Sequence, residues 1–400
     1  MKRREVKITA SNSRPDYKTS DDDSVVPVGR LIAKALAGSW LNPPPRCELS
    51  TAELARIAPL LIKSGAGGLL WRCIRETDFA HTKIGADLQA VYRLQRLESL
   101  AHIQKIKTVI THLHAAGIDS VLMKGWGVAR LYPEAGLRHY TDLDLCFAPE
   151  RARAARTALK DLGPLELYVD VHQGLGRHEK LAWSDILSRA ETVNLEDVTV
   201  RILGAEDHLR LLCLHWLRHD AWNPIGLCDI AAAFASRRPD FDWPIALGSD
   251  QKHADWMACA IGLAHQLLGV DVEGTPIAER AQRLPTWLVT EVLEQWETCL
   301  NANYRDIALA EVGPLLRSPS RVVKELSVRW HYPIRATMEV GGNFNQWPRA
   351  PYQVAAVLLR WTEFPRQIAM LIARWFRAQR RRPPSSSDTR NDLLTLNSEM

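Results

Sequence analysis

Two aspartates two residues apart, Asp142 and Asp144, are the side chains of this 400-residue sequence best suited to chemistry. They lie in Thr141-Asp-Leu-Asp-Leu-Cys-Phe147, whose alternation predicts a β-strand. Because successive strand side chains point to opposite faces, we expect both carboxylates to project the same way. Two close carboxylates repel each other unless a cation lies between them, and Mg²⁺ is a common oxygen-bound cation. A glycine turn upstream, at Lys124-Gly125, gives a phosphate room to approach the backbone. Metal and phosphate together indicate nucleotidyl transfer.

Nucleotidyl transfer with two metal ions needs a third carboxylate, which helps to hold the second ion and takes the proton from the attacking hydroxyl. We expect it on a neighbouring strand, and the segment Leu165–His172 supplies Asp170. Glu166 is the rival on the same predicted strand, about 13 Å earlier along an extended chain. Only one of the two can reach the ions. We prefer Asp170 because it lies nearer the loop at Gly174.

An α/β block over about residues 117–204 must position these carboxylates. A fourth strand, Val198–Leu203, follows the three that period-two patterns predict, and it could pair with Thr192–Leu195. Two short helices are expected between the first three strands. The three strands are Ile118–Met123, Thr141–Phe147 and Leu165–His172, and the helices are Trp126–Leu131 and Pro149–Leu162.

Helical patterns flank this block on both sides. Before it, Ser50-Thr-Ala-Glu carries a helix-capping signal, and the run Ala86–Ala116, free of Gly and Pro, predicts one long helix that Gly117 ends. Further helices are expected over Ala205–His219, Asn223–Arg237, Ala254–Leu268, Leu284–Leu300, Tyr304–Glu311, Gln353–Trp361 and Gln367–Arg382. The predicted organisation is a disordered start (1–25), an N-terminal helical segment (26–116), the α/β core (117–204), a larger helical domain (205–382) and a disordered tail (383–400).

Composition and charge are those of a water-soluble globular protein, with 46% hydrophobic and 24% charged residues and a formal net charge of +5. The seven cysteines are odd in number and form no Cys-x-x-Cys pair, which indicates reduced thiols in a cytoplasmic protein. No signal peptide is recognisable, and no apolar run approaches the ~20 residues of a transmembrane helix. The small net charge weighs mildly against an RNA partner.

A set of short motifs then resembles a large bacterial nucleotidyltransferase-like family of the DNA polymerase β superfamily, to which the aminoglycoside nucleotidyltransferases also belong. The motifs are Leu122-Met-Lys-Gly, Leu131-Tyr-Pro, Gly136-Leu-Arg, Thr141-Asp-Leu-Asp-Leu, Val169-Asp-Val-His, Leu203-Gly-Ala-Glu-Asp-His, Leu227-Cys-Asp-Ile and Phe241-Asp-Trp. The clear resemblance covers about residues 30–245. It implies a fold of α/β (α+β) class, with a polymerase-β-type mixed sheet between the two helical parts.

The resemblance also implies roles for particular residues. Lys124 and the Gly125 backbone would hold the triphosphate, with Thr141 beside them, and Arg138 would reach the phosphates or the acceptor. In the wider superfamily a serine follows the glycine, whereas this chain has Trp126.

Three residues are candidates for the acceptor side. His172 shares a strand face with Asp170 and could orient an acceptor or be a buried, hydrogen-bonded histidine. His215 is expected to face the cleft, held by Asp229 from the next helix.

The reaction we expect is transfer of a nucleoside monophosphate from an NTP to a hydroxyl or amine, with release of pyrophosphate. Two Mg²⁺ ions held by Asp142, Asp144 and Asp170 would serve it, with Asp170 as general base. A small-molecule acceptor, such as a sugar or a natural-product intermediate, is favoured. A toxin-type enzyme acting on protein or tRNA is the alternative, and a non-catalytic nucleotide-binding protein is the contrasting class. The sequence leaves open the acceptor, the base of the NTP, the oligomeric state and the role of the predicted helix Gln367–Arg382, whose end is rich in arginine.

Overall fold

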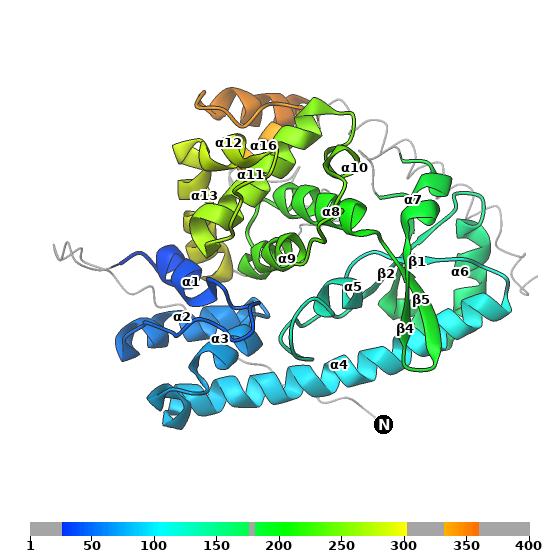
Figure 1. Ribbon diagram of the computed structural model, residues 1–400, viewed down its shortest axis with the longest axis horizontal. Coiled ribbons are helices and arrows are strands. Elements are labelled where there is room, and N and C mark those ends of the chain that lie inside the picture. The colour runs from blue at the N-terminus through cyan, green and yellow to red at the C-terminus, as the bar shows by residue number, and fades with distance from the viewer. Residues whose placement is uncertain (1–25, 176–180, 302–331, 360–400) are drawn as a thin grey trace, which may run out of the picture.

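The computed structural model describes residues 26–175, 181–301 and 332–359. It is of mixed α/β class, as expected: one five-stranded sheet in the described part of the chain, surrounded by helices (Figure 1). The predicted helices Tyr304–Glu311 and Gln367–Arg382 and the predicted disordered ends lie outside the described residues. None of the described helices is both long and apolar enough to cross a membrane.

The sheet places the two strands that carry the candidate carboxylates, Leu143–Phe147 and Val169–Gln173, beside each other at one edge. Its order is β3-β2-β1-β5-β4, formed by β1 (Val121–Leu122), β2 (Leu143–Phe147), β3 (Val169–Gln173), β4 (Glu191–Leu195) and β5 (Val198–Ile202). β2 runs parallel to β3 and antiparallel to β1, while β1 is parallel to β5 and β4 is antiparallel to β5. The mixed character therefore comes from three strands, β1, β2 and β5, that each have one parallel and one antiparallel neighbour.

Alternation along β2 separates its two faces as the sequence predicts. Leu143 and Leu145 belong to an apolar core that also contains side chains of α4 (Lys83–Ala115) and α6 (Ala152–Lys160). Cys146 belongs to a second core on the opposite face. Asp144, two residues before Cys146, therefore projects from that opposite face.

The helix α4 connects the helical part of the molecule to the sheet. It has 33 residues, a length of about 50 Å. Leu88 near its start packs into the helical core, while Ile106 and Ile110 near its end pack under the sheet. In Figure 1 it runs along the bottom of both parts. This helix fixes the distance between the sheet and the helical core.

The helices before and after the sheet share one apolar core. It joins residues from α1 and α3 to residues from α8, α9, α11 and α13. The remaining described helices complete the packing. The bounds are α1 Val28–Leu36, α2 Thr51–Lys63, α3 Gly67–Ile74, η1 Asp78–His81, α5 Trp126–Ala129, α7 Trp183–Arg189, α8 Ala205–Arg218, α9 Pro224–Ala235, α10 Trp243–Leu247, α11 Gln251–Leu268, α12 Ala278–Gln282, α13 Thr286–Asn301 and α16 Pro333–Glu339, followed by a helix described over residues 350–359.

Several local sequence signals act as predicted. The Ser50 hydroxyl accepts from the Glu53 amide and the Glu53 carboxylate accepts from the Ser50 amide, so a complete capping box begins α2. The long helix ends where Gly117 adopts a φ of +65°.

Three predicted strands begin too early: the first strand starts at Val121 and not at Ile118, and the two others affect the site. The residues before Val169 form a short 3₁₀ helix, η2 (Gly163–Tyr168), because Gly163 turns at φ +59° and Pro164 favours the turn. Glu166 lies on η2 and so never shares a strand with Asp170. The second strand begins at Leu143, which places Asp142 just before it.

Candidate active site

The parallel pairing of β2 with β3 sets Asp144 directly opposite Asp170. His172 lies two residues further along β3 and therefore shares the face of Asp170. Ligand atoms of these three side chains all lie within 4.8 Å of one another, and among the described residues they are the group of His, Cys, Asp and Glu able to hold a metal ion. Asp144 is buried, His172 half-buried and Asp170 exposed, so the group opens on one side.

Asp144 is held by two cationic or hydrogen-bonding groups. The Lys124 ammonium lies 2.8 Å from its Oδ1, and His172 Nε2 lies 2.9 Å from the same oxygen. Burial acts to raise the pKa of Asp144, but the His172 hydrogen bond and the Lys124 charge outweigh it and lower that pKa to about 2. Asp144 is therefore an anion across the physiological pH range.

Asp142 is exposed just before β2, accepts a hydrogen bond from the Thr141 hydroxyl, and lies outside the group formed by Asp144, Asp170 and His172. Partial burial, followed by the negative charges of Asp144 and Asp170, raises its pKa. The mutual repulsion of three carboxylates is the condition that a bound cation relieves. The residues present therefore fit a divalent metal.

The turn that carries Lys124 depends on glycine. Gly125 has φ +59° and ψ −114°, and a Cβ there would lie 3.0 Å from the Asp142 carbonyl oxygen. Trp126, which follows it, is partly buried against the core beneath the sheet. The Trp126 indole therefore belongs to the packing of the sheet.

We expect Gly125→Ala to lower the free energy of unfolding by about 1–3 kcal/mol, because an L-residue is strained at this φ and its Cβ crowds the Asp142 carbonyl. Urea unfolding followed by tryptophan fluorescence measures it. Gly127→Ala is the matched control in the same turn: its added Cβ would meet no atom closer than 3.7 Å, so its stability should stay within about 1 kcal/mol of wild type. Equal stability of both variants would contradict a conformational requirement for Gly125.

Arg138 is bound by Asp229 of α9. Its Nε and Nη2 donate to the carboxylate at 3.1 and 2.7 Å, and the Tyr132 hydroxyl donates to the same carboxylate at 2.8 Å. The side chains of Arg138 and Asp229 are 19% and 3% exposed. This buried pair ties the connection before β2 to the helical part of the molecule.

Asp229 was predicted to hold His215, but it binds Arg138 instead. Among the described residues, no hydrogen bond joins Asp229 to His215. His215 of α8 is half-buried, with its ring centroid 4.5 Å from that of His219. Burial, with the nearby Lys124 charge, lowers its pKa to about 3. The imidazole is therefore neutral at physiological pH.

A cavity of ≈ 370 Å³ brings most of the predicted residues together. Eight of the ten predicted site residues line it. The other two, Asp170 and His172, lie beside the lining residue Asp144. The eight are Lys124, Gly125, Arg138, Thr141, Asp142, Asp144, His215 and Asp229.

Beyond His215 and Asp229, the residues on the helical side of this cavity were not predicted as site residues from the sequence. This side is lined by aromatic and polar residues, and Ser64 and Gly65 reach it from the end of α2. The other aromatic and polar residues are His139, Tyr140, Trp216, His219, Trp222 and Asn223, and Val128, Leu212, Ile225 and Gly226 complete the lining. Tyr132, whose hydroxyl donates to Asp229, belongs to the Leu131-Tyr-Pro motif, but the sequence predicted no role for it. No local periodicity marks these residues, because they meet only when the helices pack.

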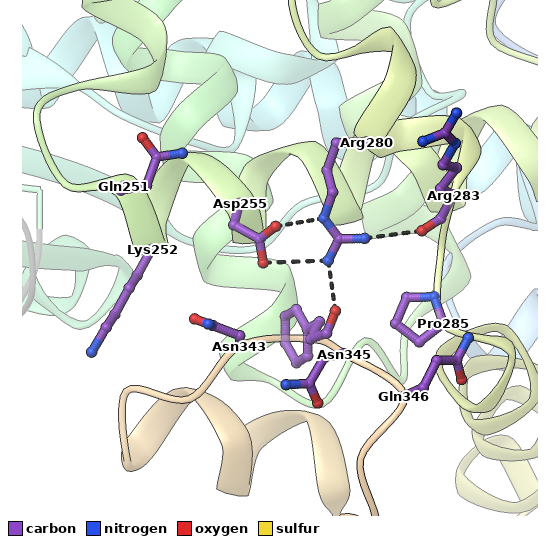
Figure 2. Close-up of a pocket in the computed structure, with 10 residues that line it drawn as sticks. Gln251, Lys252, Asp255, Arg280, Arg283, Pro285, Asn343, Asn345 and Gln346 are labelled. Atoms are coloured by element: carbon purple, nitrogen blue, oxygen red, sulfur yellow. Dashed lines mark hydrogen bonds and ion pairs between the residues drawn. The ribbon is translucent and has the colours of Figure 1, made fainter.

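A second cavity, of ≈ 590 Å³, lies between α11, α12 and the loop before residue 350. Figure 2 shows Arg280 at its centre, where its guanidinium pairs with Asp255 and donates to the carbonyls of Arg283 and Phe344. Asp255 is the sole carboxylate among the lining residues, and Arg280 neutralises it. This larger cavity therefore offers no metal site, and the chemistry is expected at the smaller one.

Comparison with known proteins identifies one family. The family described as "Uncharacterised nucleotidyltransferase" matches residues 50–166 and 164–269, together more than half of the 400 residues. The matched segments include every predicted site residue. No curated protein and no solved structure matches the chain.

Proposed function

This chain belongs to the uncharacterised nucleotidyltransferase family, and we propose that it transfers a nucleoside monophosphate from an NTP to a hydroxyl or amine, releasing pyrophosphate. The observation that carries the proposal is the pairing of Asp144 with Asp170 across β2 and β3, beside a cavity that also holds Lys124 and Gly125. A carboxylate group next to a cation and a tight glycine turn suits a metal-bound triphosphate.

Asp142, Asp144 and Asp170 are the residues that would hold divalent ions, for which the sequence predicts Mg²⁺. When bound, such ions stabilise the negative charge that develops on the α-phosphate and on the leaving pyrophosphate. The fit is supported by the raised pKa of Asp142, which reflects uncompensated carboxylate charge after burial. Asp144 is buried, whereas Asp142 and Asp170 are exposed, so Asp144 would be the ligand nearest the protein interior.

Lys124 pairs with Asp144 in this structure and would pair with the triphosphate when an NTP binds. Its ammonium now lies against Asp144 Oδ1, at 2.8 Å. Once a cation compensates Asp144, this ammonium can turn to the β- and γ-phosphates, which the left-handed backbone of Gly125 admits closely. Lys124 would then neutralise charge on the leaving group.

Asp170 is the proposed general base. It is exposed on the edge strand β3, so an acceptor can approach it from solvent. A carboxylate within hydrogen-bond reach of the acceptor hydroxyl can take its proton as the bond to the α-phosphate forms.

The helical wall of the cavity supports a small acceptor. Arg138 is neutralised by Asp229, and His215 carries no charge at neutral pH, so this wall offers neutral hydrogen-bonding groups beside aromatic rings. A polar, hydroxyl- or amine-bearing small molecule fits it best. A protein or tRNA acceptor is the second candidate, as in toxin-type enzymes.

The test is magnesium- and manganese-dependent release of pyrophosphate from each NTP, measured with a panel of small acceptors, protein and tRNA. We expect labelled nucleotide to appear on one acceptor class. Labelling of protein or tRNA alone would favour the second candidate. Silence of the wild-type protein with every NTP and acceptor, combined with retained NTP binding, would support a non-catalytic nucleotide-binding protein.

A further inference from the structure

His172 lies close enough to Asp144 and Asp170 to share a metal ion with them. Its Nε2 lies 2.9 Å from Asp144 Oδ1, and ligand atoms of His172, Asp144 and Asp170 lie within 4.8 Å of one another. We propose that His172 binds the metal ion directly through nitrogen, and that this nitrogen makes Mn²⁺ the ion the site prefers to Mg²⁺. The inference rests on the metal-dependent function proposed above, and it changes the ion that this function would use.

The geometry favours one shared ion. Ligand atoms about 2.1 Å from a common ion lie roughly 3–4 Å apart, so side-chain adjustments of under 1 Å bring all three into a common shell. Asp144 and His172 come from adjacent paired strands, and β3 carries both Asp170 and His172 on one face. Rigid strands therefore present two oxygens and one nitrogen to the same point.

The exposure of the group leaves room for substrate. Asp144 is buried, whereas Asp170 is exposed and His172 is half-buried, so solvent and substrate can reach the group beside Asp170 and His172. An octahedral ion with three protein ligands keeps three positions for phosphate oxygens and water. Catalytic zinc with three protein ligands keeps one open position, so a site that must take several phosphate oxygens favours an octahedral ion.

Ligand chemistry then selects between the two common octahedral ions. Mg²⁺ is hard, takes oxygen ligands and gives up its water reluctantly. Mn²⁺ shares the preference of Mg²⁺ for carboxylate oxygens and water, but as a first-row transition ion it also accepts imidazole nitrogen, which Mg²⁺ binds poorly. A site of two carboxylates and one imidazole therefore gains affinity for Mn²⁺ that it does not gain for Mg²⁺.

The competing interpretation is that His172 acts through Asp144, donating a hydrogen bond that orients the carboxylate. Loss of such a partner typically weakens metal binding 10–100-fold. Since Asp144 would bind either ion, this loss would weaken Mn²⁺ and Mg²⁺ by similar factors. The ratio of the two affinities therefore separates a nitrogen ligand from an orienting hydrogen bond.

Isothermal titration of the full chain with MnCl₂ or MgCl₂, without nucleotide, measures that ratio. We expect wild type to bind Mn²⁺ at least about 10-fold more tightly than Mg²⁺. His172→Gln, which puts an amide oxygen near the position of Nε2, should lower Mn²⁺ affinity about 10-fold and change Mg²⁺ affinity less than about 3-fold. An unchanged ratio in the variant, or equal wild-type affinities for the two ions, would overturn the proposal.

Pulsed electron paramagnetic resonance of the Mn²⁺-loaded protein gives an independent readout. Wild type should show ¹⁴N coupling from a directly bound imidazole, and His172→Gln should lose it. His139→Gln is the matched control: His139 lines the same cavity but pairs with Glu98 at 3.2 Å, so the coupling should persist. Absence of ¹⁴N coupling in wild type would overturn the proposal even if the His172 variant failed to fold. Neither experiment needs an NTP or acceptor, so a failed transferase assay leaves its outcome interpretable.

Discussion

Replacing Asp144 with asparagine should lower the rate of NTP-dependent pyrophosphate release on the order of 10³-fold, or about 4 kcal/mol in barrier height. Asp144 is the buried member of the carboxylate group, and it faces both Asp170 and the Lys124 ammonium. Asparagine keeps the shape but removes the charge that would hold a cation near the α-phosphate. The measurement is steady-state kinetics with the NTP and acceptor that the panel identifies.

Two further variants make this result specific to the site. Asp170→Asn should be impaired to a similar degree, because it would remove the proposed general base. Glu166→Gln should keep wild-type activity, because Glu166 lies on η2 outside the group. Thermal unfolding and circular dichroism check that each variant is folded. Full activity of a folded Asp144→Asn protein would eliminate the proposed metal-dependent reaction.

Asp229→Ala should lower the free energy of unfolding by about 3–5 kcal/mol, the largest stability effect that we expect from a single substitution in the cavity. Asp229 is 3% exposed and compensates Arg138, while Tyr132 also donates to it. Its removal leaves a largely buried guanidinium without a counter-charge and a buried hydroxyl without its acceptor. Urea unfolding followed by tryptophan fluorescence gives the difference.

An exposed ion pair supplies the matched control. Glu279 lies on α12 and pairs with Arg283, the residue that follows this helix, and both side chains are 77% exposed. Glu279→Ala should therefore lower the free energy of unfolding by less than about 1 kcal/mol. The double variant Arg138→Met with Asp229→Leu should recover much of the lost stability, because it removes both charges and fills the space with apolar side chains. A loss below about 1 kcal/mol for Asp229→Ala would show that the pair does not stabilise the fold.

The strand assignments show how far periodicity alone reaches. The alternation of Thr141–Phe147 correctly predicted that Leu143 and Leu145 would turn to one face and Asp144 to the other. The same reasoning failed for Glu166, since Gly163 and Pro164 turn the chain before β3 begins. An apolar pattern does not distinguish an extended segment from a short 3₁₀ helix when turn residues start it.

The sequence by itself determined the local features of this protein: the fold class, the long helix α4, the glycine turn at Gly125 and the carboxylates that β2 and β3 carry. These follow from side-chain periodicity, turn chemistry and resemblance, all of which act within short stretches of chain.

Only the tertiary structure decided which partners the site residues take. Arg138 and Asp229 are 91 positions apart, and Asp144 and His172 are 28 apart. Their contacts arise because the helices before and after the sheet share one core, which brings α9 to the connection before β2, and because β2 and β3 pair in one register. Such contacts depend on the packing of whole elements. The sequence alone therefore could not assign the hydrogen bond between His172 and Asp144 or the ion pair between Arg138 and Asp229.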